Sequence, residues 1–293
     1  MLPAAKMASD TLKEGLRVMA LNSVNTNVGA MVALQNLAVT NSELSTVQSR
    51  INTGKKVNSA KDNGAIWAIA QGQRAEMGAL NAVKDSLNRG QSAVDVGIAA
   101  GETVSDLLTQ MKEKALAATD QSLSTAARSA LNEDFVALRK QIVSTVSNAK
   151  FNGVAVISGT AGFKALADAA GSTTIDIAAE DMTLSGAVVT LTATASIATQ
   201  TDASANLALV NASIENVSAS LARLGTGSKA LGTHLNFVSK LQDTIDSGIG
   251  NLVDADLAKE SARLQALQTK QQLGVQALSI ANSSTSMLLG LFR

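Results

Sequence analysis

The sequence has no cysteine and a single proline, Pro3. Without cysteine there are no disulfides, no thiolate chemistry and no cysteine-ligated zinc or iron–sulfur centre. After Pro3 no residue lacks a backbone N–H, so long helices are permitted over almost the whole chain. Aromatic residues make up only 2% of the chain, although 46% of its residues are hydrophobic. The apolar content is therefore mainly small and branched aliphatic, which suits helix–helix packing along a seam better than a bulky enzyme core.

The chain also has no excess of charge, because 24 basic residues balance 24 acidic ones. Nucleic-acid binding needs a basic surface, so this balance argues against a nucleic-acid partner. It suits a subunit that packs against many copies of itself, and equally an ordinary near-neutral protein. No apolar stretch approaches the roughly 20 residues that span a bilayer, so no membrane partner is predicted. Charged residues interrupt the first 18 positions, which do not form a cleavable secretory signal.

Groupings of residues that would carry catalysis are missing as well. No nucleophile–base set, metal cluster or cofactor loop is evident, so the sequence predicts no enzyme activity, no cofactor and no metal. The only histidine, His234, is interpreted as a helix-surface residue. Asp254 and Asp256 lack the spacing of a calcium loop and are interpreted as acidic residues at the start of a helix.

The first helical segment is expected over residues 22–51, before a structured loop over residues 52–64. Its heptad positions are Ala30, Leu37, Leu44 and Ile51, with Leu34 and Val47 at intermediate positions. A second helix is expected over residues 65–118, with Val83, Leu87, Val94, Ile98, Leu107, Leu108, Met111 and Leu116 on one stripe. A third is expected over residues 125–149, capped by Ser124 or Thr125 and facing inward through Leu131, Phe135, Leu138, Ile142 and Val146.

The middle of the chain has a different character. Asn152-Gly153 lies between apolar residues and predicts a tight hairpin, because both residue types tolerate positive φ. Residues 159–201 are rich in Thr, Ala, Ser and Gly, and the run over residues 188–194 has strand propensity. We expect a small β-rich insert exposed at one end.

Helical periodicity returns over residues 202–248, and a last helix is predicted to start near Asp254 or Asp256. The seam of that helix is predicted at Val253, Leu257, Glu260, Leu264, Leu267, Gln271, Gly274, Leu278, Ala281, Thr285 and Leu288. The fold class is therefore mainly α: a long antiparallel helical bundle or coiled coil from both chain ends, with a short β-hairpin and a small β-rich insert in the middle. Terminal helices with imperfect seams would pair with each other and then with other chains.

Several motifs together resemble those of bacterial flagellins. The most specific N-terminal stretch runs over residues 50–63 and reads RINTGKKVNSAKDN, similar to the segment in which the end helix of a flagellin passes into the shaft. Its motif positions are Arg50, Asn52, Gly54, Asn58, Ser59, Ala60, Lys61 and Asp62. Asn152 and Gly153 match the family's hairpin, and the wording after Asp62 is similar to alphaproteobacterial flagellins.

The C-terminal resemblance begins at Asp254 and Asp256 and closes on Leu288-Leu289-Gly290-Leu291-Phe292-Arg293. The resemblance implies that polymerisation uses the terminal coiled coil. Its expected residues are Leu34, Leu37, Leu44, Ile51, Leu257, Leu264, Leu267, Leu278, Leu288, Leu291, Phe292 and Arg293.

This family resemblance also implies a domain plan. Residues 19–52 and 252–293 would form the terminal coiled-coil core, and residues 53–154 and 202–251 the helical shaft with its β-hairpin. Residues 155–201 would form a variable surface insert. Residues 1–18 lie outside the family pattern, and Met19 is expected to be the true start.

The implied function is an exported subunit that polymerises into the extracellular flagellar filament for swimming. Its implied partners are copies of itself and other flagellins, hook–filament junction and filament cap proteins, an export chaperone and the flagellar type III export apparatus. A junction protein of the flagellum is the main alternative, since such proteins resemble flagellins at both ends. An intracellular coiled-coil scaffold is a further alternative, and it predicts helical ends without assembly.

Overall fold

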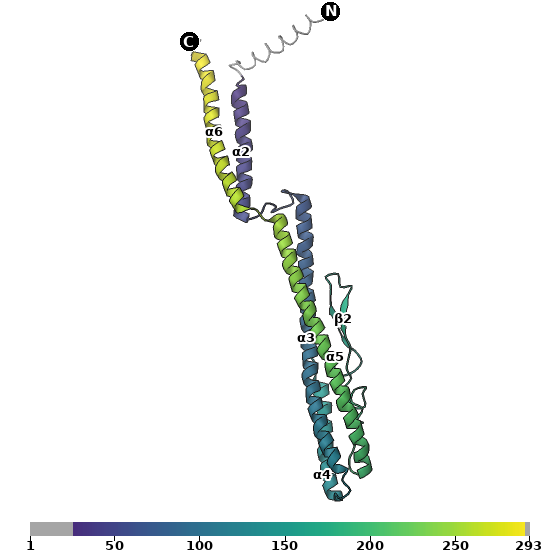
Figure 1. Cartoon of the computed structure of the whole chain (residues 1–293). Helices are drawn as coiled ribbons and strands as arrows, with labels where there is room; N and C mark the ends of the chain where they lie inside the picture. Colours follow the sequence, from purple (N-terminus) through teal and green to yellow (C-terminus); the bar gives the residue numbers. More distant parts are fainter. Residues whose placement is uncertain (1–25, 291–293) are drawn as a thin grey trace, which may run out of the picture. The chain divides into compact units, whose positions relative to one another are not determined.

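A computed structural model describes residues 26–290, with side chains described as far as Ser283 (Figure 1). Its helices are α2 (Val28–Thr53), α3 (Gly64–Ala118), α4 (Thr125–Asn148), α5 (Gln200–Val253) and α6 (Leu257–Gly290). Two short strands, β1 (Phe163–Leu166) and β2 (Thr174–Ile177), lie between α4 and α5. The chain divides into two compact units. We call the described part of residues 1–72 and 248–293 the terminal unit, and residues 73–247 the central unit. The predicted fold class is confirmed.

The central unit is a bundle of α3, α4 and α5 with a strict heptad core. In α5, buried side chains recur every seven residues at Ala203, Val210, Val217, Leu224, Leu231 and Val238. In α3, two interleaved heptad series face inward, among them Leu80, Val83, Leu87, Val94, Val104, Leu108, Met111 and Ala115. Phe135, Ile142 and Val146 of α4 complete this core, as their spacing predicts. The predicted stripe on α3 is wrong at Leu116, which falls between the two series and is 56% exposed.

Glycines occupy three buried positions of the α3 heptad, where the segment between α4 and α5 approaches closely. A Cβ on Gly90 would overlap the ring of Phe163, and one on Gly97 would overlap Val156. At Gly101 the nearest neighbour of such a Cβ would be Leu221 of α5, at 2.8 Å. Removing the side chain at these positions lets the insert and α5 pack directly on the α3 backbone.

Local capping and turns form where the sequence predicts them. Ser124 caps α4, since its Oγ accepts a hydrogen bond of 3.2 Å from the amide of Ala127. Asn152 and Gly153 have φ of 48° and 80°, and Phe151 and Val154 exchange two backbone hydrogen bonds of 2.9 Å around them. The predicted Asn-Gly hairpin is confirmed as a minimal one, because the ladder does not extend beyond this single pair.

The insert contains one antiparallel pair of strands, but not where the sequence placed it. β1 and β2 pair with Phe163 opposite Ile177 and Leu166 opposite Thr174. The predicted strand over residues 188–194 is wrong, because this segment packs on α5 instead of on another strand. The amide of Thr190 donates to Ser213 Oγ at 3.1 Å, and Asn216 Nδ2 donates to the carbonyl of Val188 at 3.3 Å. Val188, Val189 and Leu191 are buried. Side chains of α5 and the backbone of Asp181 and Ser185 supply the hydrogen bonds that a ladder would have supplied.

Polar contacts fasten the insert to the bundle. Arg223 of α5 donates two hydrogen bonds of 2.6 Å to the carboxylate of Glu180. Asn132 Oδ1 of α4 accepts the amide of Ile197 at 2.7 Å. The prediction that His234 is a helix-surface residue needs correction, since it is half-buried and its Nε2 lies 2.7 Å from the carbonyl oxygen of Ala167.

No helix in the described part of the chain combines the length and apolar character needed to cross a membrane.

Candidate functional site

The terminal unit is built on an antiparallel pairing of α2 with α6, which lie side by side in Figure 1. Asn27, just before α2, donates from Nδ2 to the carbonyl of Ala281 near the far end of α6 at 2.8 Å. At the opposite end, Arg50 Nη1 lies 3.2 Å from Glu260 Oε1. The start of α2 thus lies beside the C-terminal part of α6 around Ala281, and the end of α2 lies beside the start of α6.

The seam between these helices follows the predicted heptads. Ala30, Leu37, Leu44, Ile51, Leu264, Gln271, Gly274, Leu278 and Ala281 are half-buried, and Val47, Glu260 and Leu267 are buried. Gly274 allows close approach, because a Cβ there would lie 3.3 Å from Leu37 Cδ1.

Two of the leucines expected in this seam lie outside it. Leu34 is 57% exposed and Leu257 is 49% exposed. Leu34 is one position past the inward-facing heptad position of Ala33, so it points to the flank of the helix. Leu257 is the first residue of α6, ahead of the first turn that α2 covers. The side chain of Leu288 and residues Leu291, Phe292 and Arg293 lie outside what the structure describes.

Polar side chains interrupt the apolar seam at matched levels of the two helices. Thr40 is 2% exposed and satisfies its hydroxyl by donating to the carbonyl of Asn36 at 2.9 Å. Gln271 Nε2 donates to Asn41 Oδ1 at 2.7 Å. A slip in register would separate Gln271 from Asn41, so this contact favours one alignment of α2 on α6, whereas the Thr40 hydrogen bond lies within α2 and only satisfies its buried hydroxyl. The sequence analysis did not predict that Gln271 pairs with Asn41, although both are polar residues at or beside heptad positions.

The outward faces of α2 and α6 carry large apolar side chains that none of the described residues covers. Exposed members are Val28, Met31, Val32, Leu34, Val39, Leu257, Leu273, Val275 and Ile280. Between Thr26 and Ala38 they line a shallow, mostly apolar hollow on α2. Soluble monomers seldom leave so many large apolar groups exposed together on one small unit.

Where α2 ends, the chain turns at a glycine with left-handed geometry. Gly54 follows the last residue of α2 with φ of 68°, the conformation that usually ends a helix at glycine. Its carbonyl accepts the amide of Ala255 at 2.9 Å, and the amides of Lys56 and Val57 donate to the carbonyl of Val253 at 2.7 and 3.3 Å. Lys55 and Asp254 form an isolated antiparallel bridge at the same place. Backbone bonds therefore tie the α2–α3 loop to the α5–α6 connection.

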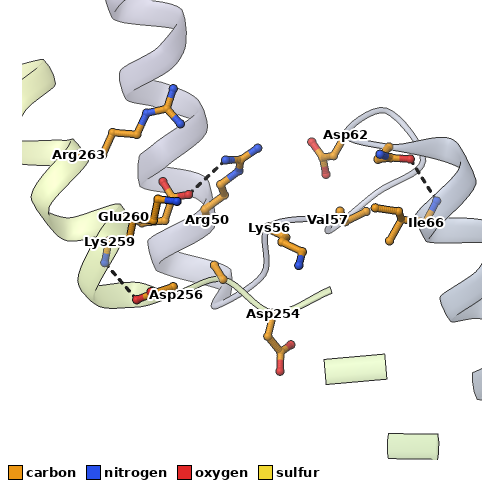
Figure 2. Close-up of a pocket in the computed structure, with 12 residues that line it drawn as sticks. Arg50, Lys56, Val57, Asp62, Ile66, Asp254, Asp256, Lys259, Glu260 and Arg263 are labelled. Carbon is orange, nitrogen blue, oxygen red and sulfur yellow. Dashed lines mark hydrogen bonds and ion pairs between the residues drawn. The ribbon is translucent and has the colours of Figure 1, made fainter. Parts of the chain in front are cut away.

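Aspartate side chains stabilise this junction from both connecting segments, and Figure 2 shows Asp62 and Asp256 among them. Asp62 Oδ2 accepts the amides of Asn58 and Ser59 at 3.0 and 2.8 Å and the Ser59 hydroxyl at 3.2 Å. The backbone amides of Ser59 and Asn58 hold the pKa of Asp62 below its ordinary value. Asp256 Oδ1 accepts the amides of Ala258 and Lys259, both at 3.1 Å, so Asp256 lies at the start of α6 as predicted and also caps it.

Not every motif residue has a contact of this kind. Asn52, Ala60 and Lys61 are exposed, and Asp254 joins the bridge to Lys55 instead of capping α6. Asn152 and Gly153 belong to the central unit. Asn63, which sequence reasoning passed over, caps α3 by accepting the amide of Ile66 at 3.1 Å.

A pocket of about 470 Å³ opens at this junction, and Figure 2 shows its lining. The positive and negative charges of its lining are equal in number. The basic residues are Arg50, Lys56, Lys259 and Arg263, and the acidic ones are Asp62, Asp254, Asp256 and Glu260. Glu260 Oε2 is buried without a hydrogen-bond partner among the described residues. A balanced ring of this kind suits a structural junction, and the described residues contain no group of three or more potential ligands that could hold a metal.

Comparison with known families matches both ends of this fold. The bacterial flagellin N-terminal helical region matches residues 24–162, and the bacterial flagellin C-terminal helical region matches residues 207–292. Together they cover α2, α6, the junction between them, and α3, α4 and most of α5.

Sequence relatives agree with these matches. Flagellin FljM of Caulobacter vibrioides is 59% identical over 276 residues, covering 94% of this chain and 100% of that protein. A flagellin of Brucella melitensis is 35% identical over 285 residues, covering 92% and 99%. A Vibrio parahaemolyticus protein described provisionally as a flagellar hook-associated protein has a TM-score of 0.52 at 16% identity, covering 66% of this chain and 100% of that one. That last likeness shows the fold alone, so a junction protein is not favoured.

Matching end regions, close identity over nearly the full chain and paired terminal helices agree with one another. The chain therefore belongs to the bacterial flagellin family, whose members are the structural subunits of the extracellular flagellar filament.

Proposed function

We propose that the outward faces of α2 and α6 are the surfaces through which copies of this chain, and other flagellins, bind one another in the filament. The observation that carries the proposal is the set of large apolar side chains left exposed there, from Val28 and Met31 on α2 to Val275 and Ile280 on α6. Burying apolar surface contributes roughly 25 cal/mol per Å², so repeated contacts of this kind favour association.

Folding of this helix pair is proposed to be coupled to assembly. Among the described residues, only Thr40 and Val47 of α2 are buried, so the pair has little core of its own there. Helices stabilised mainly by tertiary packing lose that stability when their apolar faces lack a partner. Neighbouring subunits would supply the missing burial. Residues 19–52 and 252–293 would then form the filament core, residues 53–154 and 202–251 the shaft, and residues 155–201 the solvent-facing insert.

Other partners are proposed from the family resemblance. They are the export apparatus, an export chaperone, the cap and the hook–filament junction. A chain whose ends stay unpaired before assembly would present its apolar C-terminal segment to a chaperone during export.

Seeded polymerisation of the purified chain tests the assembly surface. Met31→Ser and Ile280→Ser each remove an exposed apolar group without touching the seam. We expect both to slow filament growth in light scattering and to raise the subunit concentration that growth requires. The matched control is Ser45→Ala, at an exposed polar position of the same helix as Met31.

Electron microscopy of the products, and far-UV circular dichroism before and after seeding, complete the test. A gain of helix on seeding supports coupled folding. Growth of both apolar variants at the rate of the unchanged protein would overturn the assignment of these faces.

A further inference from the structure

The dipeptide Asn-Gly occurs twice in the sequence, at residues 63–64 and 152–153. This dipeptide is chemically labile. The glycine amide nitrogen has little steric cover and can attack the side-chain carbonyl carbon of the preceding asparagine. How readily it does so depends on how firmly the structure holds the asparagine side chain. The two copies differ in this respect.

Asn152 lies in an open turn. Asn152 and Gly153 are both exposed, and no described residue hydrogen-bonds the Asn152 side chain. The turn is closed only by the isolated bridge between Phe151 and Val154, with two hydrogen bonds of 2.9 Å. An exposed turn held by one pair of residues opens at small free-energy cost. Opening lets the backbone leave the left-handed geometry and bring the Gly153 nitrogen to the Asn152 side chain.

Asn63 is held from both its side chain and its backbone. Its Oδ1 accepts the amide of Ile66 at 3.1 Å, and its carbonyl accepts the amide of Trp67 at 2.9 Å. Gly64 is the first residue of α3, so its backbone is fixed by the helix that follows. Attack by the Gly64 nitrogen would require loss of the cap and fraying of the first turn of α3.

From this contrast we infer that Asn152 is a site of spontaneous deamidation in the folded protein and that Asn63 is protected. In the reaction the Gly153 nitrogen bonds to Cγ of Asn152, the Cγ–Nδ2 bond breaks, and ammonia leaves with the Gly153 amide proton. Water then adds to one of the two carbonyl carbons of the succinimide, and the bond from that carbon to the ring nitrogen breaks. Cleavage at Cγ gives aspartate at position 152, and cleavage at the main-chain carbonyl carbon gives isoaspartate.

Either product changes the hairpin. Aspartate adds a negative charge to a turn that follows Lys150. Isoaspartate adds one backbone carbon, and a two-residue turn that pairs Phe151 with Val154 cannot accommodate it without losing that register. The fraction of subunits with aspartate or isoaspartate at position 152 would therefore increase with the age of the protein.

To test this, the full-length chain is incubated in mildly alkaline buffer, once in the native state and once in guanidinium chloride. Samples are then digested with trypsin at mildly acidic pH, and deamidation at both asparagines is followed by mass spectrometry of the peptides. Trypsin releases Asn152 in the peptide spanning residues 151–164 and Asn63 in the peptide spanning residues 62–74. Electron-transfer fragmentation separates aspartate from isoaspartate, and Asn152→Asp supplies the reference mass. Deamidation raises the peptide mass by the difference between an amide and a carboxylate.

In the native protein we expect Asn152 to convert at least about tenfold faster than Asn63, because protected sites react only through their open fraction. In denaturant the two rates should come within about threefold of each other, because the cap of α3 is gone. Native rates that are equal, or faster at Asn63, would overturn the inference. So would a rate ratio that is the same in denaturant as in the native protein, because sequence alone would then explain it.

Discussion

Arg50 Nη1 lies 3.2 Å from Glu260 Oε1, which ties the last turn of α2 to the first turn of α6. The acidic partner lies at a helix start and the basic partner at a helix end, where each also interacts favourably with its own helix dipole. The Glu260 side chain is 11% exposed and that of Arg50 is 31% exposed, so the pair is shielded more than an ordinary surface ion pair.

Replacing Glu260 should weaken the filament more than it weakens the central unit. Glu260→Gln leaves Arg50 without its charged partner, and we expect a loss of about 1–3 kcal/mol in the terminal unit. Thermal depolymerisation of filaments measures this loss as a lower transition temperature. Glu76→Gln, at an exposed position of α3, is the control and should leave the transition unchanged. An equal effect of both variants would contradict a specific role for the pair.

Gly54→Ala should destabilise the junction through backbone strain alone. The φ of 68° disfavours any side chain, although no atom lies within 4 Å of a Cβ built there. We expect a cost of about 1 kcal/mol from forcing alanine into this conformation. Gly64→Ala is the matched control, because Gly64 has the same open surroundings and lies in α3. Chemical denaturation of filaments should separate the two, and a neutral Gly54→Ala would contradict the strain argument.

Alanine should have opposite effects at two helical glycines of the central unit. At Gly97 a Cβ would overlap Val156, so we expect overpacking to cost about 1–3 kcal/mol. At Gly225 nothing lies within 4 Å, so alanine should stabilise α5 by up to about 1 kcal/mol through helix propensity. Thermal unfolding of the full chain, followed by circular dichroism, tests both. Two changes of the same sign would contradict the close-approach explanation.

The Asp62 carboxylate should make the junction sensitive to acid. Its folded pKa is below the ordinary 3.8, because the backbone amides of Ser59 and Asn58 bind the charged form. A depressed folded pKa contributes stability that is complete above the ordinary pKa and is lost as pH falls through the folded value. NMR titration of the Asp62 carboxyl carbon should show a midpoint below 3.8. Asp62→Asn should remove the part of the acid sensitivity that this carboxylate causes. A titration midpoint of Asp62 at or above 3.8 would contradict the prediction.

Local features of this flagellin follow from its sequence. The heptads place Leu37, Leu44 and Leu264 in the seam, and Ser124 and Asp256 cap helices as their positions predict. Asn152-Gly153 forms its turn because few residue types adopt positive φ cheaply. Such features depend on residues only a few positions away in the chain, so they can be predicted from the sequence alone.

Tertiary structure decided what depends on distant neighbours. The outward position of Leu34 depends on which side of α2 meets α6. Residues 188–194 do not form a strand, because α5 side chains and irregular backbone contacts within the insert supply their hydrogen bonds. The pairing of Arg50 with Glu260 and the need for glycine at position 97 likewise depend on contacts between segments far apart in the chain. Periodicity fixes which face of a helix is apolar, whereas only packing decides which surface covers it.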